Sequence, residues 1–299
     1  MANSSAEVLP LSAATKIADY HIAPEGKPHS KIEITQAEHR IRLVNAWAPA
    51  LGPGSRVLEL GCGQGTCTAV LAEAAGETGH VDAVDPGSPD YGAPYTLAQA
   101  QGHLSQGAIG SRISWHRADP VDFLKEQGDK TWDVAVLAHC IWYFKSPEAL
   151  AEILAALKGR VGKILVAEHA MQATEKAAIP HLLSTLARST LEAHRGNSDE
   201  NIQNPLSPAG IKEIAVKEGW TIKGESIVVP EQGLSDGFWE TGTVKSEKFL
   251  VTIEQAVSDS RVKLLLRSAR DAVLSSIAAI GELKNVRTMD TWVATLEVV

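Results

Sequence analysis

The sequence predicts an α/β protein built on a doubly wound, mostly parallel β-sheet. Three observations support this fold class. Short apolar runs typical of buried strands alternate with longer runs that carry apolar residues at helical spacing. A glycine-rich turn follows the first strand, and polar or charged residues end the others. Because ligands of such sheets bind at the carboxyl ends of the strands, these end residues are the candidates for a functional site.

Five predicted strands form the parallel part of the sheet, and the fourth is apolar enough to be buried on both faces. The predicted strands are 57–60, 80–85, 113–117, 132–138 and 163–167. A first long helix is predicted from Thr35, and another over 182–194. Ser146 and Ser207 each precede a proline, which predicts a helix with a serine cap and proline at its first position.

The C-terminal third departs from this alternation. Segments at about 171–210 and 231–285 are helical or loop-like, and they lie on either side of a sixth strand at 221–229. A final strand is predicted at 291–298. The last two strands are thus separated by a helical insertion.

The chain shows no repeat, low-complexity tract or long linker, so we predict a single domain over 1–299. An N-terminal helical segment, about 12–50, and the two insertions would form a cap over a substrate. Residues 1–12 are small and polar, which predicts a disordered N-terminus.

Composition argues against several classes of protein. A net charge of −8 disfavours tight binding of nucleic acid, since phosphates need a basic surface. Cys62, Cys67 and Cys140 form neither a disulfide framework nor a zinc-ligand pattern. No stretch has the pattern of a signal peptide or the length of a membrane span. We therefore expect a cytoplasmic protein with a small-molecule partner, as a monomer or a dimer.

The turn after the first strand carries the strongest functional signal. Gly61, Gly63 and Gly65 lack a Cβ atom, so a ligand can approach the backbone, and the helix that follows offers free N–H groups. Asp85 ends the second strand about 20 residues after the last glycine, where an acid binds ribose hydroxyls in a βαβ unit. The alternative interpretation is an ordinary tight turn and a solvated acid.

Two nucleotide cofactors compete for such a unit. Dinucleotide sites use G-x-G-x-x-G, whereas here the third glycine comes one place earlier and Glu59 stands two places before the first. The pattern E-x-G-x-G-x-G resembles motif I of the class I S-adenosylmethionine (SAM) methyltransferases. The resemblance implies a Rossmann-like, seven-stranded sheet with an antiparallel last strand. It also implies SAM as the methyl donor and S-adenosylhomocysteine as a product.

The same resemblance implies which residues bind SAM. Glu59 and the glycines would meet its methionine part, Asp85 its ribose and Asp119 its adenine amino group. A turn residue before a proline is the alternative for Asp119. The predicted cofactor-binding residues are Tyr20, Glu59, Gly61, Cys62, Gly63, Gly65, Asp85, Pro86, Asp119, Pro120, Val121 and His139.

A more distant resemblance extends from Ile113 to the C-terminus. The pair Trp115-His116, the segment 139–145 after the fourth strand and the insertion before the last strand are similar to histamine N-methyltransferase and its relatives. Where that family has a glutamine, this chain has His139. We therefore carry over methyl transfer to a small organic molecule, such as a secondary metabolite, and not the substrate.

His139 is the main candidate on the acceptor side. It ends the fourth strand, where the methyl group should point, and an imidazole can hold or deprotonate an acceptor near neutral pH. His21 and His29 are further catalytic candidates, because this N-terminal segment often closes over SAM in the superfamily. The predicted substrate-binding residues are Glu33, Trp142, Tyr143, His169, Phe238 and Trp239. Packing or a local hydrogen bond is the alternative role for each.

The resemblance implies direct SN2 displacement, because the sulfonium of SAM is already activated. The protein aligns the nucleophile, the methyl carbon and the sulfur, and excludes water. The sequence gives no pattern of histidines and carboxylates that predicts a metal. Three alternatives stay open: an NAD-dependent oxidoreductase, a SAM-fold protein that binds a ligand or catalyses a rearrangement, and a macromolecular methyltransferase.

Overall fold

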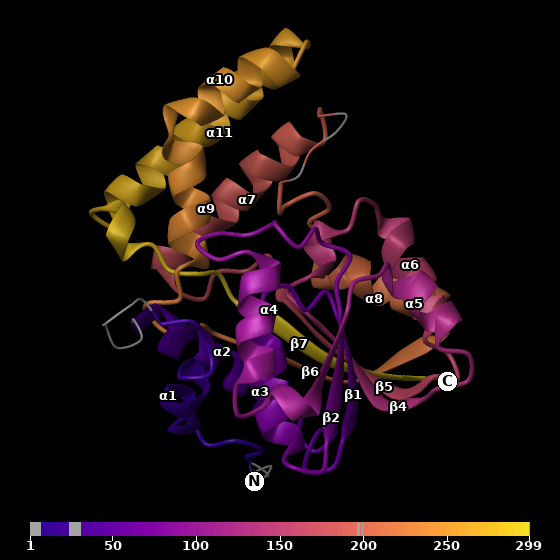
Figure 1. The fold of residues 1–299 in the computed structure, drawn as a ribbon. Helices are drawn as coiled ribbons and strands as arrows, with labels where there is room; N and C mark the ends of the chain where they lie inside the picture. Colours follow the sequence, from indigo (N-terminus) through magenta and orange to yellow (C-terminus); the bar gives the residue numbers. More distant parts are fainter. Residues whose placement is uncertain (1–6, 24–30, 196–197, 199, 299) are drawn as a thin grey trace, which may run out of the picture.

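The computed structural model describes residues 7–23, 31–195, 198 and 200–298. Its centre is a seven-stranded sheet in the order β3-β2-β1-β4-β5-β7-β6 (Figure 1). The strands are β1 (Arg56–Leu60), β2 (His80–Val84), β3 (Ile113–His116), β4 (Trp132–Ala138), β5 (Val161–His169), β6 (Trp220–Val228) and β7 (Thr291–Val298). The neighbouring strands from β3 to β5 pair in parallel, and β7 is antiparallel to both β5 and β6. The predicted sheet with an antiparallel last strand is confirmed.

Alternate residues of β1 enter two hydrophobic cores, one on each face of the sheet. Val57 belongs to the first core and Leu58 and Leu60 to the second. The first core is covered by α1 (Ala13–Ala18), α2 (Lys31–Ala46), α3 (Thr66–Ala75) and α4 (Leu97–Gln106). The second is covered by α5 (Pro120–Glu126), α6 (Pro147–Ala156) and α8 (Pro208–Lys217). Burial on both faces explains the nearly continuous apolar runs of the central strands.

Parallel pairing brings the carboxyl ends of the central strands to one edge of the sheet. Leu60 of β1 pairs with Val84 of β2, and Ala138 of β4 pairs with Ala167 of β5. The residues that follow these strands therefore meet at this edge.

Four helices beyond this edge form a cap: α7 (Ile179–Glu192), α9 (Asp236–Lys245), α10 (Glu247–Ala256) and α11 (Ser260–Ala279) (Figure 1). Their shared core includes Leu191, Val244, Phe249 and Leu266. The last three of these helices lie between β6 and β7, so the predicted insertion is present. Helix α9 lies within the predicted insertion but was not predicted as a separate helix.

The helix starts predicted from Ser-Pro pairs are confirmed. The Ser207 hydroxyl accepts a hydrogen bond from the Gly210 N–H at 3.3 Å, and α8 begins at Pro208. Ser146 occupies the same position before α6, but its side chain makes no capping hydrogen bond, so only the start of this helix is as predicted. The helix predicted from Thr35 begins earlier, at Lys31. Short 3₁₀ turns, which the sequence did not predict, are η1 (Gly110–Arg112), η2 (Ile141–Tyr143), η3 (Lys176–Ala178) and η4 (Leu283–Asn285).

The N-terminal segment is more ordered than predicted. The Asn45 side-chain oxygen on α2 accepts hydrogen bonds from the backbone N–H groups of Val8 and Leu9, each at 3.0 Å. The prediction of disorder over 1–12 is therefore wrong for residues 7–12, because a side chain of α2 satisfies their backbone groups. Residues 1–6 lie outside the described residues.

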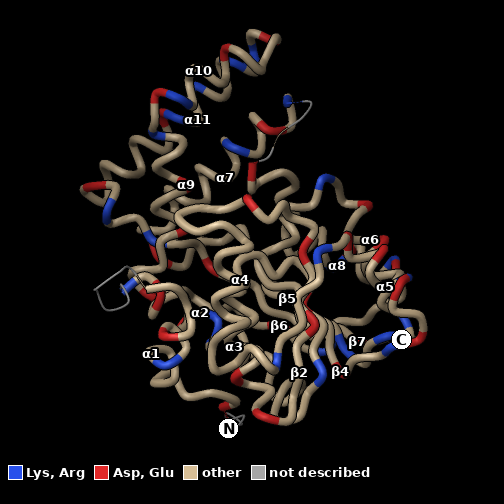
Figure 2. The backbone as a smooth tube through the Cα atoms, viewed as in Figure 1, with Lys and Arg blue, Asp and Glu red and all other residues tan. Residues whose placement is uncertain are grey.

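Charged residues of both signs are mixed along the described chain (Figure 2). Charged residues of both signs occur along the projecting helices α10 and α11, and most of those on α11 are Lys or Arg. None of the described helices has the length and apolar character needed to cross a membrane.

Candidate active site

Three glycines with left-handed backbones build the turn between β1 and α3. Their φ angles are 76° at Gly61, 53° at Gly63 and 90° at Gly65. A Cβ at Gly61 would lie 2.5 Å from the Cys140 Cβ, and one at Gly65 would lie 2.6 Å from the Leu104 Cδ1. At Gly63 no described atom lies within 4 Å of such a Cβ. The two outer glycines are thus required by packing, and the middle one borders space that a ligand can enter.

Asp85, the predicted strand-end acid, holds this turn. Its Oδ2 accepts a hydrogen bond from the Gly63 N–H at 2.8 Å, and its Oδ1 accepts one from the Gly87 N–H at 2.8 Å. The neighbouring Pro86 is exposed. The structure therefore brings the acid and the glycine turn together, and a contact with ribose stays a prediction.

Glu59 is buried under the turn, with 2% of its surface exposed. Its Oε2 accepts a hydrogen bond from the Thr68 hydroxyl in the first turn of α3. Burial raises the pKa of Glu59 to about 8, although Thr68 and Cys67 favour the ionised form. Glu59 is therefore largely protonated at neutral pH. Burial also raises the pKa of the nearby Cys62 thiol, which stays neutral.

Asp119 is the cap of α5, a helix that the sequence analysis did not predict. Its Oδ1 accepts hydrogen bonds from the N–H groups of Val121 at 2.8 Å and Asp122 at 3.3 Å. Pro120 occupies the first helical position and is buried. Since Asp119 already has a structural role, its contact with adenine stays a prediction.

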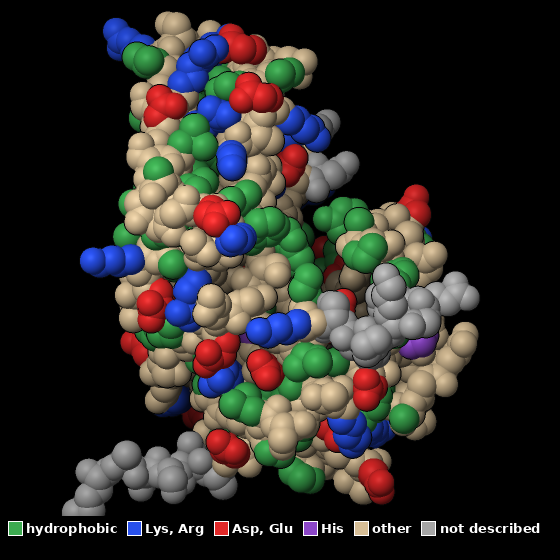
Figure 3. Space-filling model, turned by 90° about the vertical axis from the view of Figure 1, so that its left-hand side faces the viewer, with side chains coloured by type: hydrophobic (Ala, Val, Ile, Leu, Met, Phe, Trp, Pro, Cys, Tyr) green, Lys and Arg blue, Asp and Glu red, His purple; other side chains and the backbone are tan. Residues whose placement is uncertain are grey.

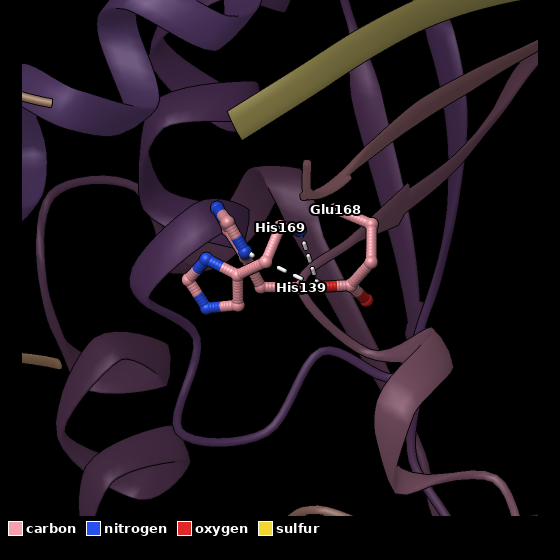
Figure 4. Close-up of side chains that lie close together, drawn as sticks. All are labelled: His139, Glu168 and His169. Carbon is pink, nitrogen blue, oxygen red and sulfur yellow. Dashed lines mark hydrogen bonds and ion pairs between the residues drawn. The ribbon is translucent and has the colours of Figure 1, made fainter. Parts of the chain in front are cut away.

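His139 follows β4 in a backbone conformation that is uncommon outside glycine, with φ of 53°. Its N–H donates to the Ala167 carbonyl oxygen at 2.8 Å. Its Nδ1 lies 3.5 Å from the Glu168 Oε1 (Figure 4). Its Nε2 lies 3.1 Å from the His39 Nε2 on α2. Unusual backbone conformations of this kind are concentrated at functional sites.

Glu168 is a fixed carboxylate beside His139. Its Oε2 accepts a hydrogen bond from the Ile141 N–H at 3.0 Å, and its Oε1 accepts one from the His169 N–H at 2.9 Å. Burial opposes ionisation, but the contact with His139 and the backbone N–H of His169 hold the pKa of Glu168 below its usual value. A buried anion therefore adjoins the imidazole.

Two further imidazoles extend the cluster. The His169 ring centroid lies 4.7 Å from that of His139 and 5.2 Å from that of His181 on α7. Burial lowers the pKa of His169 to about 4, and lowers the pKa values of His39 and His181 well below the usual value. These three rings are neutral at neutral pH. The His181 Nδ1 accepts a hydrogen bond from the Met289 N–H at 2.9 Å, so its proton is on Nε2.

A cavity of about 110 Å³ lies against this cluster, between the sheet edge and the cap. Figure 3 shows a hollow between the projecting helices and the body of the molecule, with hydrophobic side chains at its rim. The cavity is lined by Arg40, His139, Trp142, Tyr143, Glu168, His169, His181, Asn201, Ile202, Leu234, Asp236 and Glu240. Its wall thus combines aromatic rings with charged and neutral polar groups.

Four predicted site residues meet at this cavity: His139, Trp142, Tyr143 and His169. Phe238 and Trp239 lie on α9 but are 39% and 49% exposed, and Asp236 and Glu240 of the same helix line the cavity in their place.

The N-terminal candidates lie apart from the cavity lining. The Tyr20 hydroxyl donates to the Glu73 Oε2 at 3.0 Å, and so joins the α1 region to α3. His21 and Glu33 are not among the lining residues. His29 lies outside the described residues.

Sequence reasoning missed His39, Arg40 and His181. His39 stands midway between Thr35 and Leu43, at intervals of four residues on the buried face of α2. This spacing was a usable signal, because a polar side chain on a buried helix face needs a partner. His181 gave no such signal, since its position depends on how α7 packs on the cap.

Comparison with known proteins identifies the family. The sequence profile of the family described as "Methyltransferase domain" matches residues 34–222, more than half of the chain. The chain belongs to this methyltransferase family. As the sequence predicts, it is a SAM-dependent enzyme.

Two curated relatives of this methyltransferase are Methyltransferase phomM' and Methyltransferase phomM of Diaporthe leptostromiformis. Each is 26% identical over alignments that cover 92% of this chain and 86% of the relative. A cyclopropane-fatty-acyl-phospholipid synthase-like protein from Lactobacillus casei has a similar structure, with a TM-score of 0.83, 29% identity, and coverage of 96% of this chain and 100% of that one.

A sarcosine dimethylglycine methyltransferase from Galdieria sulphuraria shares the fold, with a TM-score of 0.51, 13% identity and coverage of 93% and 92%. The family decides against the NAD-dependent alternative and against a SAM-fold protein without methyl transfer.

Proposed function

We propose that this methyltransferase transfers the methyl group of SAM to a small organic molecule, such as a secondary metabolite, by direct SN2 displacement. The observation that carries the proposal is the small cavity at the carboxyl ends of β4 and β5, with a histidine and a buried carboxylate in its wall. Its volume of about 110 Å³ suits part of a small molecule. We also propose a cytoplasmic location, since the three cysteines are free thiols.

On the cofactor side, we propose that the methionine part of SAM lies along the glycine turn, at the open flank of Gly63. Asp85 would accept hydrogen bonds from the ribose hydroxyls, in addition to the hydrogen bond that it already accepts from the Gly63 N–H. The adenine would lie near Asp119, with Pro120 and Val121 beside it. We propose that Tyr20, Glu59, Cys62 and Pro86 also border this site.

On the acceptor side, we propose that His139 orients the acceptor and receives its proton. Glu168 favours this role, because a carboxylate beside the ring stabilises the imidazolium that forms when His139 takes a proton. Trp142 and Tyr143 provide an aromatic wall. Positioning contributes about 7–11 kcal/mol and a base roughly 10²–10⁴-fold in rate.

The cap is proposed to cover the acceptor. Asp236 and Glu240 of α9 and His181 of α7 reach the cavity from this side. Because these helices belong to the insertions of the sheet, they supply acceptor contacts without altering the cofactor side.

The test is transfer of label from methyl-labelled SAM into a cell extract that is then separated into small-molecule and macromolecular fractions. We expect label in a small molecule, which can then be identified. Label in protein or nucleic acid would overturn the proposed acceptor class. Binding of S-adenosylhomocysteine without any transfer of label would contradict the proposed reaction with the acceptors present in that extract.

A further inference from the structure

Four histidines from distant parts of the chain converge in the core of the site. His39 lies on α2, His139 follows β4, His169 ends β5 and His181 lies on α7. The ring centroids are separated by 5.3 Å, 4.7 Å and 5.2 Å in that order. Glu168 lies beside the middle pair (Figure 4). One base needs one imidazole, so methyl transfer alone does not account for this array.

The spacing within the middle group fits a metal ion. His139, Glu168 and His169 each offer one ligand atom, and these three atoms lie within 4.8 Å of one another. The 3.5 Å between the His139 Nδ1 and the Glu168 Oε1 is long for an N–H···O hydrogen bond. It is close to the separation, about 3.4 Å, of two ligands in a tetrahedral site with bonds of about 2.1 Å.

The imidazole nitrogens also lack other partners. The Nδ1 atoms of His139 and His169 are shielded from solvent and have no hydrogen-bond partner among the described residues. A shielded nitrogen without a partner is costly, and coordination of a cation would offset that cost. The carboxylate, in contrast, is held in place by the backbone N–H groups of Ile141 and His169. His39 holds the His139 ring from the other side, as the outer partners of metal ligands do.

We propose that His139, Glu168 and His169 bind a divalent transition-metal ion, with its remaining coordination positions open to the cavity. Two imidazoles and one carboxylate are a usual ligand set for zinc and for iron(II), and three protein ligands with an open position are typical of catalytic sites. Binding of the ion does not depend on the identity of the acceptor.

The use of the ion rests on the proposed function. An acceptor heteroatom that coordinates the ion loses its proton to water more readily. Its lone pair then forms the bond to the methyl carbon, while the carbon–sulfur bond breaks and its electrons return to sulfur. When the ion is bound, His139 is one of its ligands and no longer acts as the base. The ion then lowers the pKa of the acceptor.

The binding test uses full-length protein without a histidine tag, stripped with a chelator and then titrated with Co²⁺. We expect one Co²⁺ per chain by calorimetry, with visible absorption bands of coordinated cobalt. His169→Ala should weaken this binding at least tenfold. His80→Ala is the matched control, because His80 begins β2 at the opposite end of the strands, and it should bind Co²⁺ as the wild type does. Equal binding by all three proteins, or no stoichiometric binding by the wild type, would overturn the proposal.

A second measurement guards against misfolding of the variant. In the wild type, Co²⁺ should raise the unfolding temperature, and an unchanged temperature at saturating Co²⁺ would count against the site. The labelling assay separates the two proposals. Label transfer without Co²⁺ binding would leave the methyl transfer standing with His139 as its base and would refute the metal site. Stoichiometric Co²⁺ binding that His169→Ala abolishes would support the metal site even if no acceptor were labelled.

Discussion

At neutral pH the buried Glu59 side chain carries a proton, since burial raises its pKa to about 8 from the usual 4.5. Between about pH 5 and 8, Glu59 of the folded protein holds a proton that the same side chain has released in the unfolded chain. The free energy of unfolding therefore falls as pH rises from about 5 to 8, by at most about 1.4 kcal/mol per pH unit from this group.

A Glu59→Gln variant removes this dependence, because glutamine does not titrate. We expect its stability relative to the wild type to increase from about pH 5 to pH 8 in denaturant unfolding experiments. A difference that stays constant over this range would mean that Glu59 is ionised in the folded protein.

Asp85 connects the second strand to the glycine turn through the hydrogen bond that it accepts from the Gly63 N–H. We expect Asp85→Ala to weaken binding of S-adenosylhomocysteine by a factor of ten or more, about 1.4 kcal/mol, in calorimetric titration. Asp271→Ala, an exposed change on α11, is the control and should leave the affinity unaltered. Unchanged binding by Asp85→Ala would remove the ribose assignment.

His139 is predicted to affect chemistry more than cofactor binding. His139→Ala should lower kcat about 100-fold, since it removes the group that meets the acceptor, while the SAM affinity changes only a few-fold. Single-turnover kinetics with the identified acceptor measures both quantities. An equal loss of turnover and SAM affinity would indicate that His139 serves the cofactor alone.

At the scale of single elements, the glycine turn is required both for packing, at Gly61, and for the proposed binding of SAM, at Gly63. Gly61→Ala puts a Cβ against Cys140 and should reduce the free energy of unfolding by about 1–3 kcal/mol. Gly63→Ala meets no atom within 4 Å, so it should cost mainly the left-handed backbone, about 1–2 kcal/mol, and yet weaken SAM binding more strongly.

Thermal unfolding and titration with S-adenosylhomocysteine together separate the two variants. Gly102→Ala serves as the control, because Gly102 lies within α4 with no atom near the added methyl group. If Gly63→Ala bound the cofactor normally, the open flank of the turn would not be the place of the methionine part.

The strands were the most predictable elements. The fourth strand was predicted at 132–138 and β4 spans Trp132–Ala138, because a strand buried on both faces is a continuous apolar run between polar residues. Helix α9 was missed because Gly237 and Gly242 are weak helix formers. Gly237 is required by a contact outside the helix: a Cβ there would lie 2.4 Å from the Arg287 carbonyl oxygen.

The candidate site could be predicted only where it follows the chain locally. Gly61, Asp85 and His139 end strands, so the strand pattern alone located them. His39 and His139 lie 100 residues apart and meet through the packing of α2 on the sheet edge, which no local pattern encodes.

At the scale of the whole molecule, one buried arginine links the cap helices α7 and α9 to each other. Arg188 on α7 forms ion pairs with Glu200 and with Glu240 of α9, and it donates to the Asn201 side-chain oxygen at 2.8 Å. Arg188→Ala leaves the mostly buried Glu240 carboxylate without its cationic partner and should lower the free energy of unfolding by about 3–5 kcal/mol.

The same variant should raise the KM for the acceptor, since Glu240 lines the cavity. Arg267→Ala removes an exposed ion pair of the same cap, with Glu254, and should cost at most about 1 kcal/mol. Denaturant unfolding and steady-state kinetics provide the comparison. Equal effects of the two variants would mean that the buried pair does not hold the cap in place.

The pairing of Val228 with Thr291 has a consequence for how such enzymes diversify. The segment 229–290 leaves the sheet and returns to it at two neighbouring positions of one hairpin. A segment whose ends are this close can be lengthened, shortened or exchanged in a single genetic event without disturbing the strands around it. Enzymes that descend from one ancestor can therefore bind new methyl acceptors by exchanging the segment 229–290. The strands and the glycine turn of the proposed SAM site then stay unchanged.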